Sequence, residues 1–219
     1  MYWIIFITFA LLSWIVSASL ERKFAKYSRV GISMTGAQVA EKMLRDSGIT
    51  DVQVVSTAGH LTDHYNPVTK TVNLSESVYN SASIAAAAVA AHECGHAVQH
   101  QVEYAPLKMR SALVPVVNFA NRWVVWVMLI GMLVFETFPQ LIYIGIGLYG
   151  LTTLFAFITL PVEINASERA VAWLEESGVA NRETKEMASD ALHSAAYTYV
   201  VAALGSLAYL IYLILGTRR

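Results

Sequence analysis

Four long apolar stretches constrain the fold of this chain more than any other feature of its sequence. They cover residues 2–20, 112–135, 137–162 and 194–216, and three of them contain no charged residue. A helix rises about 1.5 Å per residue, so each stretch is long enough to cross a bilayer. Of the 219 residues, 56% are hydrophobic and only 14% are charged, whereas charged residues make up about a quarter of a soluble domain. We therefore predict a mainly α integral membrane protein with about four transmembrane helices.

The first two stretches each raise an alternative. Residues 2–20 lack a basic start and a small-residue cleavage site, which favours a retained signal anchor over a cleaved signal peptide. The second stretch contains Asn118 and Arg122, and polar residues at membrane depth usually face the protein interior or serve a function. We prefer the plainer interpretation, in which this helix starts outside the membrane and enters the lipid near Trp123.

The charges beside the first stretch predict the topology. A basic segment follows it, with Arg22, Lys23, Lys26 and Arg29, so the positive-inside rule puts residues 21–110 in the cytoplasm. Two spans separate this region from residues 163–193, so the two regions share one side of the membrane whatever its orientation. They can therefore build one site together, within a single unit that covers residues 1–219.

Residues 21–110 carry the patterns of a small α+β part. A short helix is predicted after Thr35, which forms a capping box with Gln38, and Gly48 ends it. Residues 51–55 and 71–74 alternate in polarity and are predicted to be strands.

A long helix follows, capped by Ser81 or Ser83 and running to about residue 101. Its alanine run has high helix propensity, and such small side chains let neighbouring helices approach closely. Beyond the third span, "PVEINASERAVAWLEESG" is predicted to be a separate helix that ends at Gly178, and the next helix continues into the fourth span.

The long helix contains the pattern H-E-x-x-H, within "AHECGHAVQH". Positions i and i+4 share one helix face, so His92 and His96 can present ring nitrogens to one metal ion. Glu93 lies beside the first histidine, where its carboxylate can reach a water on the metal. The pattern alone occurs by chance in many proteins, but here it lies well inside a predicted helix with small neighbours.

A catalytic zinc ion usually has three protein ligands and one open position. One class of zinc peptidases has another histidine six residues after the second, but Val102 occupies that position here. We favour Glu163, which follows the third span at the start of a predicted helix, on the correct side of the membrane. Glu168, Glu175 and Glu176 lie further along that helix and are expected to be solvated.

The segments "AAHECGHAVQH", "LTDHYNP" with "VNLSESVYN", and "PVEINASERA" resemble the YugP-type family of membrane zinc metallopeptidases, along essentially the whole chain. That family is similar in design to the HtpX and CAAX-prenyl membrane proteases. The resemblance implies a zincin-like α+β catalytic part with a small β-sheet and a Zn²⁺ cofactor. It also implies His92, His96 and Glu163 as ligands and Glu93 as general base. In the HtpX-like pattern an aspartate follows the ligand glutamate by four positions; Ser167 stands there in this chain, and it can hydrogen-bond a ligand histidine without adding charge.

Hydrolysis at such a site needs Glu93 to take a proton from the attacking water and pass it to the leaving amine. It also needs a group that stabilises the oxyanion. Four side chains on the predicted cytoplasmic side qualify: His193, Tyr197, Tyr199 and Arg169. An ordinary interfacial position explains His193 equally well, and an aromatic belt at the membrane surface explains the two tyrosines better.

The segment "LTDHYNP" is predicted to be extended and precedes the metal helix. In zinc peptidases of this design, an edge strand there pairs with the substrate backbone. Asp63, His64 and Tyr65 are therefore candidates for substrate contact, although a structural role in the turn is favoured for His64. Cys94, the single cysteine, points away from the two histidines and is expected to be a packing residue.

These patterns predict an integral-membrane zinc endopeptidase that acts on membrane-associated polypeptides, with its site on the cytoplasmic side. The net charge of −1 argues against a nucleic-acid partner. The alternative is a metal-binding membrane scaffold, or a partner in a larger assembly, without peptidase activity. The presence of Glu93 argues against a scaffold. A structural zinc site fills its fourth position with a protein ligand, whereas Glu93 is placed to act on a water in that position. Cobalt or manganese could replace zinc with these ligand types.

Overall fold

The structure is a computed structural model, and it describes residues 2–217. Its four longest helices are α1 (Tyr2–Tyr27), α5 (Ala105–Leu133), α6 (Gln140–Glu176) and α7 (Arg182–Gly216). Each of the four is long and apolar enough to cross a membrane. The predicted mainly α membrane fold with four such helices is thus confirmed.

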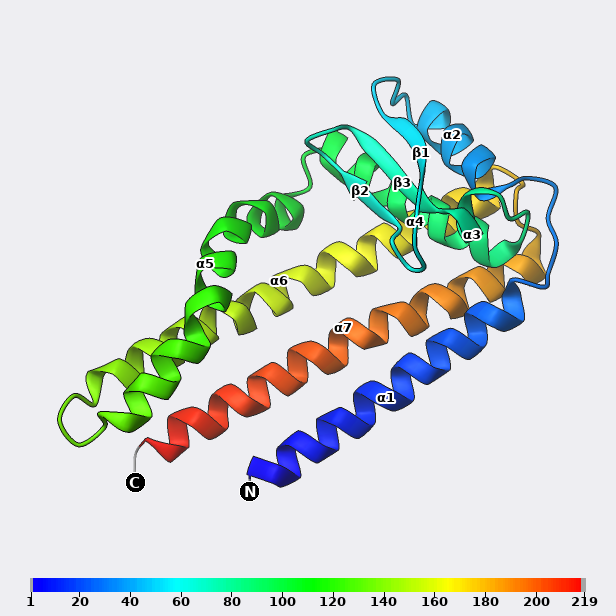
Figure 1. The fold of residues 1–219 in the computed structure, drawn as a ribbon. Coiled ribbons are helices and arrows are strands. Elements are labelled where there is room, and N and C mark those ends of the chain that lie inside the picture. Colours follow the sequence, from blue (N-terminus) through cyan, green and yellow to red (C-terminus); the bar gives the residue numbers. More distant parts are fainter. Residues whose placement is uncertain (1, 218–219) are drawn as a thin grey trace.

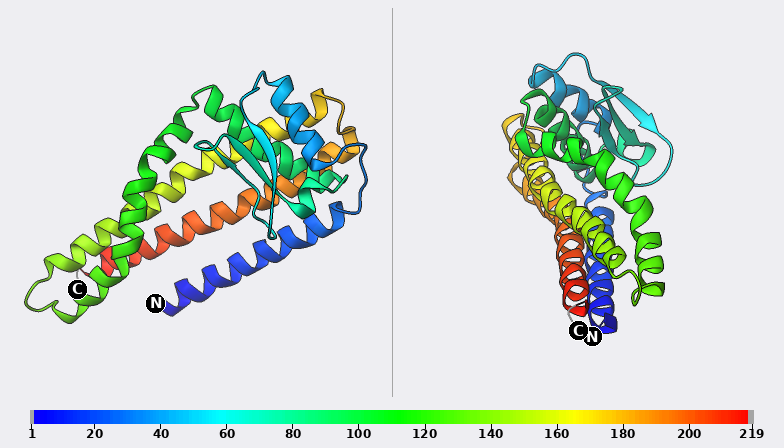
Figure 2. Two further views of the ribbon diagram at one scale, coloured as in Figure 1. Left: turned by 45° about the horizontal axis from the view of Figure 1, so that its top comes forward. Right: turned by 90° about the vertical axis from the view of Figure 1, so that its left-hand side faces the viewer.

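The four long helices form one bundle (Figures 1 and 2). In the bundle, α5 packs against α6, α6 against α7, and α7 against α1. Large apolar side chains face outward, with Trp14 on α1 69% exposed and Trp126 on α5 61% exposed. A soluble protein rarely leaves so much apolar surface uncovered, so these outer faces suit lipid.

Two of the long helices extend beyond the predicted spans. The α5 helix begins at Ala105, ahead of the predicted span at 112–135, and Pro106 in its first turn suits a helix start. The α6 helix continues through Pro161 to Glu176, where a separate helix was predicted. Proline removes one backbone hydrogen bond, but long membrane helices tolerate it. As a result Glu163 lies inside a continuous helix rather than at a helix start.

The remaining elements form a small α+β part at one end of the bundle (Figure 1). They are α2 (Gly36–Asp46), β1 (Gln53–Thr57), β2 (His64–Asn66), β3 (Thr71–Ser75), α3 (Glu76–Tyr79) and α4 (Ile84–Gln101). The sheet has the order β1-β3-β2, with β1 parallel and β2 antiparallel to the central β3. The short strand β2 was predicted only as extended chain, and it forms an edge of the sheet.

The predicted helix ends of this part are confirmed. Thr35 and Gln38 form the capping box of α2, and Gly48 has a φ of +71° just after the helix, a conformation that favours glycine. The N-cap of α4 is Ser83, whose hydroxyl accepts a hydrogen bond from Ala86 N–H. Its neighbour Ser81 instead shares a side-chain hydrogen bond with Ser83.

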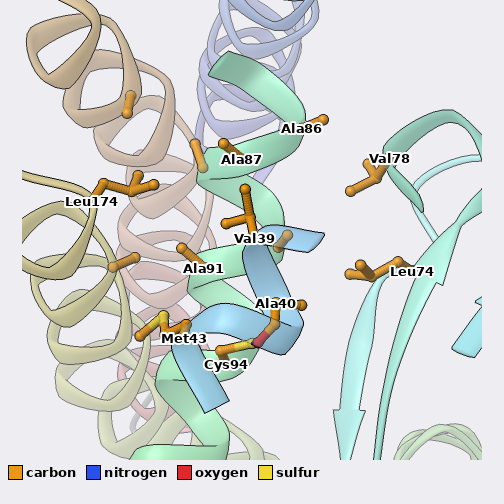
Figure 3. Packing of buried hydrophobic residues seen from close by; sticks show 14 of the residues in the cluster. Val39, Ala40, Met43, Leu74, Val78, Ala86, Ala87, Ala91, Cys94 and Leu174 are labelled. Atoms are coloured by element: carbon orange, nitrogen blue, oxygen red, sulfur yellow. The ribbon is translucent and has the colours of Figure 1, made fainter. Parts of the chain in front are cut away.

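The α4 helix runs through the middle of the apolar core and packs against both α2 and α6 (Figure 3). Its contact with α6 is unusually close, because a Cβ atom at Gly95 would lie 2.6 Å from the Ala166 carbonyl oxygen. Cys94 is fully buried, and burial raises the pKa of its thiol. The small residues of α4 therefore bring the H-E-x-x-H face directly against α6.

Candidate metal centre

Three side chains converge where α4 meets α6. His92 Nε2 lies 3.4 Å from Glu163 Oε2, and His96 Nε2 lies 3.7 Å from the same oxygen. The three ligand atoms lie within 4.8 Å of one another. Tetrahedral zinc with bonds of about 2.0–2.2 Å separates its ligand atoms by roughly 3.3–3.6 Å. The donor set is one that zinc takes, and the two histidine–glutamate distances are close to this spacing.

The other ring nitrogen of each histidine is already occupied. His92 Nδ1 lies 3.1 Å from the hydroxyl of Ser167, and His96 Nδ1 lies 3.1 Å from Gln99 Oε1. A carbonyl oxygen can only accept, so His96 Nδ1–H donates and leaves Nε2 with its lone pair. This arrangement holds ligand histidines in the orientation that a metal requires.

Gln99 is fully buried and links α4 to α6. Its Nε2 donates to the Val162 carbonyl at 2.8 Å and to Asn165 Oδ1 at 3.1 Å. Arg169 Nε donates to the same Asn165 oxygen at 2.8 Å. Arg169 was a candidate for the oxyanion. In the structure it instead ends a polar chain, by which we mean the hydrogen bonds that run from His96 through Gln99 and Asn165 to Arg169.

The site carries excess negative charge. Burial alone lowers the pKa of His96, but the nearby carboxylates of Glu163 and Glu93 outweigh this effect and raise it. Arg110 on α5 contributes the nearest fixed cation, with Nη1 3.7 Å from Glu163 Oε1. A divalent cation between the histidines would balance the two carboxylates. Arg110 carries no recognisable signal in the sequence.

Glu93 is nearly buried beside the ligands, and its Oε2 accepts a hydrogen bond of 3.0 Å from the Tyr65 backbone N–H. The edge strand β2 thus contacts the H-E-x-x-H face. Asp63 accepts hydrogen bonds from the Ser75 amide and hydroxyl, which makes it a brace between β3 and the preceding loop. His64 is exposed, and its Nδ1 lies 2.7 Å from the carbonyl oxygen of Thr62 in the same loop.

Two cavities meet at this centre. The smaller, about 340 Å³, lies between β2, α4 and the first turns of α5. The larger, about 590 Å³, lies between α1, α4, α7 and the loop that joins β1 to β2. Both are lined by the same five residues, namely Asp63, His92, Glu93, Glu163 and Tyr199. The metal centre therefore lies in the middle of one continuous cleft.

The remaining oxyanion candidates are His193, Tyr197 and Tyr199, all of which lie on α7. His193 Nδ1 lies 2.8 Å from the Ser189 carbonyl, and the side chain lines a separate cavity of about 290 Å³ between α6 and α7. Tyr197 is 58% exposed and lines neither cavity at the metal centre. Tyr199 lines both of these cavities. It lies two residues after Tyr197, and side chains two residues apart in a helix point to nearly opposite faces. Of the residues considered on α7, the structure brings Tyr199 to the cleft.

Two comparisons agree with the resemblance that the motifs predicted. The family model described as "Putative neutral zinc metallopeptidase" matches residues 2–218. The "Putative membrane protease YugP" of Bacillus subtilis (strain 168) is 43% identical over 207 residues, which cover 93% of this chain and 91% of that protein. No solved structure matches significantly. Because the family model covers nearly the whole chain, the protein belongs to this family, described as "Putative neutral zinc metallopeptidase".

Proposed function

We propose that the protein is an integral-membrane zinc endopeptidase with His92, His96 and Glu163 as metal ligands. One observation carries the proposal: a buried carboxylate oxygen lies 3.4 and 3.7 Å from two histidine Nε2 atoms whose Nδ1 atoms are already engaged. That is the donor set of a zinc site with an open fourth position. The family match and the "Putative membrane protease YugP", at 43% identity, point the same way.

Glu93 is the general base. Zinc, when bound, supplies the Lewis acid that activates a water and the scissile carbonyl. Glu93 lines the cleft on both sides of the ligands, so its carboxylate can accept the proton of the attacking water and deliver it to the leaving amine. The Tyr65 amide holds this carboxylate by one oxygen and leaves the other free to act.

Tyr199 is the favoured donor to the oxyanion. Its side chain lines both cavities beside Glu93 and Glu163, and a phenol hydroxyl can donate a hydrogen bond to a developing negative charge. Ser167 and Gln99 act through the histidines that they orient. The substrate backbone lies beside β2, the edge strand whose residues His64 and Tyr65 line the smaller cavity.

We place the active site on the cytoplasmic side. The α+β part, the end of α6 and the start of α7 lie at one end of the bundle (Figure 1). The last turns of α1, which carry Lys23 and Lys26, lie at the same end, and Lys23 pairs with Asp190 of α7 at 2.7 Å. A basic end of this kind is retained on the cytoplasmic side.

The test compares the wild type with Glu93→Gln in detergent, for zinc content and for cleavage of casein. We expect one zinc per chain in both proteins and cleavage by the wild type alone, because glutamine keeps the shape but cannot accept the proton. Zinc without cleavage in the wild type would favour the scaffold alternative. Cleavage by Glu93→Gln at the wild-type rate would exclude Glu93 as the base.

A further inference from the structure

The two halves of the cleft differ in chemistry. The smaller cavity has a mixed lining, with Leu107 and Val114 beside Arg110 and Ser111 on its α5 side, and His64 and His100 elsewhere. The larger cavity is walled mostly by apolar side chains from three helices and one loop, including Leu20, Phe24, Val89, Leu192, Ala196 and Leu61. At about 590 Å³ it has the size of pockets that receive small-molecule ligands, about 300–1,000 Å³.

The loop between β1 and β2 lines this larger cavity with His60, Leu61 and Asp63, and we call this loop the lip of the cavity. Leu61 has a φ of +58° and is 61% exposed, and a left-handed conformation is uncommon for a leucine. The loop is compact, because Thr62 Oγ1 donates to the Ala58 carbonyl and a Cβ at Gly59 would lie 2.7 Å from Thr62. An exposed leucine that lines a cavity in an uncommon conformation is a candidate for contact with a ligand.

The larger cavity lies level with the predicted ends of the membrane spans. Its α1 wall runs from Ser17 to Ala25 and its α7 wall from Leu192 to Tyr199, and the predicted spans end at residue 20 and begin at residue 194. On α6, Glu163 directly follows the predicted third span. Three helices thus place the cavity at one membrane boundary, where a membrane-anchored polypeptide would emerge.

We propose that the larger cavity is the specificity pocket of the cleft. It receives a bulky apolar side chain adjacent to the cleaved bond, from the segment of a membrane-anchored polypeptide that emerges at the membrane surface. This inference rests on the proposed peptidase function. The cavity is lined by two of the proposed ligands, His92 and Glu163, and by Glu93, so a side chain held there belongs to a residue next to the reacting carbonyl.

The test maps the cleavage sites in casein by mass spectrometry for zinc-loaded wild type, Ala196→Phe and Ala202→Phe. Ala196 lines the pocket, so phenylalanine there fills it, whereas Ala202 is exposed on the same helix and lines neither cavity at the metal. The wild type is expected to select bulky apolar residues at one position flanking the cut. Ala196→Phe should lower the ratio of bulky to small residues there by at least about tenfold, and Ala202→Phe should leave it unchanged.

Zinc content is the control for folding, because a variant that has not folded does not bind zinc. The second variant is Leu61→Ala, at the exposed lip of the cavity. It should bind zinc normally and reduce the same ratio several-fold. Two results would refute the specificity pocket while leaving the peptidase function intact. One is casein cleavage with no selected position, and the other is an unchanged ratio of bulky to small residues in both zinc-loaded variants. Absence of any cleavage by the zinc-loaded wild type overturns both.

An activity-independent measurement uses Glu93→Gln and a peptide that carries benzoylphenylalanine as its only bulky apolar residue. Photo-crosslinks to the α1 and α7 walls, around Leu20 and Leu192, support the pocket. Crosslinks confined to α5, or crosslinks abolished by added phospholipid, would mean that lipid or another surface occupies these walls and would refute it.

Discussion

Replacing Gln99 by leucine should weaken zinc binding without breaking the fold. Leucine is close to glutamine in size, so the change leaves little cavity but removes the hydrogen bonds to His96, Val162 and Asn165. At about 1 kcal/mol for each bond, the loss of folding free energy is roughly 3 kcal/mol. Loss of the partner of a ligand histidine costs about 10–100-fold in metal affinity.

A competition titration against a chromophoric chelator, in detergent, measures this affinity for wild type, Gln99→Leu and Gln101→Leu. Gln101 is exposed at the end of the same helix, so its variant controls for the change in composition. Circular dichroism checks that both variants keep their helices. If zinc affinity in Gln99→Leu stays within about twofold of the control, the polar chain does not position His96 and our account of the site is wrong.

Three further changes have definite expected outcomes. Gly95→Ala puts a methyl group against the Ala166 carbonyl, so we expect about 1–3 kcal/mol of destabilisation by thermal unfolding, together with weaker zinc binding. A variant as stable as the wild type would contradict the close packing of α4 on α6. Tyr199→Phe should keep its zinc and lose about 10²–10³-fold in kcat; an unchanged kcat would remove Tyr199 from the mechanism. The Cys94 thiol is buried with a raised pKa, so at about pH 8 iodoacetamide should label it only after denaturation, and rapid labelling of the native protein would contradict that burial.

The local features of this chain were predictable because they depend on residues close in sequence. The capping box at Thr35, the stop at Gly48 and the four spans follow from short patterns, and the structure contains them. The pairing of His92 with His96 is likewise a property of one helix turn. Their meeting with Glu163 depended on an argument about membrane sides, and the structure brings the three together.

Other features depended on tertiary packing and were missed or misplaced. Pro161 looked like a helix boundary, but the surrounding bundle supports a continuous α6. Gln99 lies three residues after His96 on the same face, a spacing that could have identified it. Its partner Asn165 becomes visible only once α4 packs on α6. The choice of Tyr199 over Tyr197 depends on the rotation of α7, which an apolar sequence with little periodicity does not define.

The ligand set itself is tested most directly by zinc stoichiometry in Glu163→Ala beside Glu168→Ala. Both glutamates lie on α6, but Glu163 is buried at the two histidines and Glu168 is exposed. We predict one zinc per chain in the wild type and in Glu168→Ala, and loss of zinc after gel filtration in Glu163→Ala. Full zinc retention in Glu163→Ala would contradict the assembly of one metal site from α4 and α6.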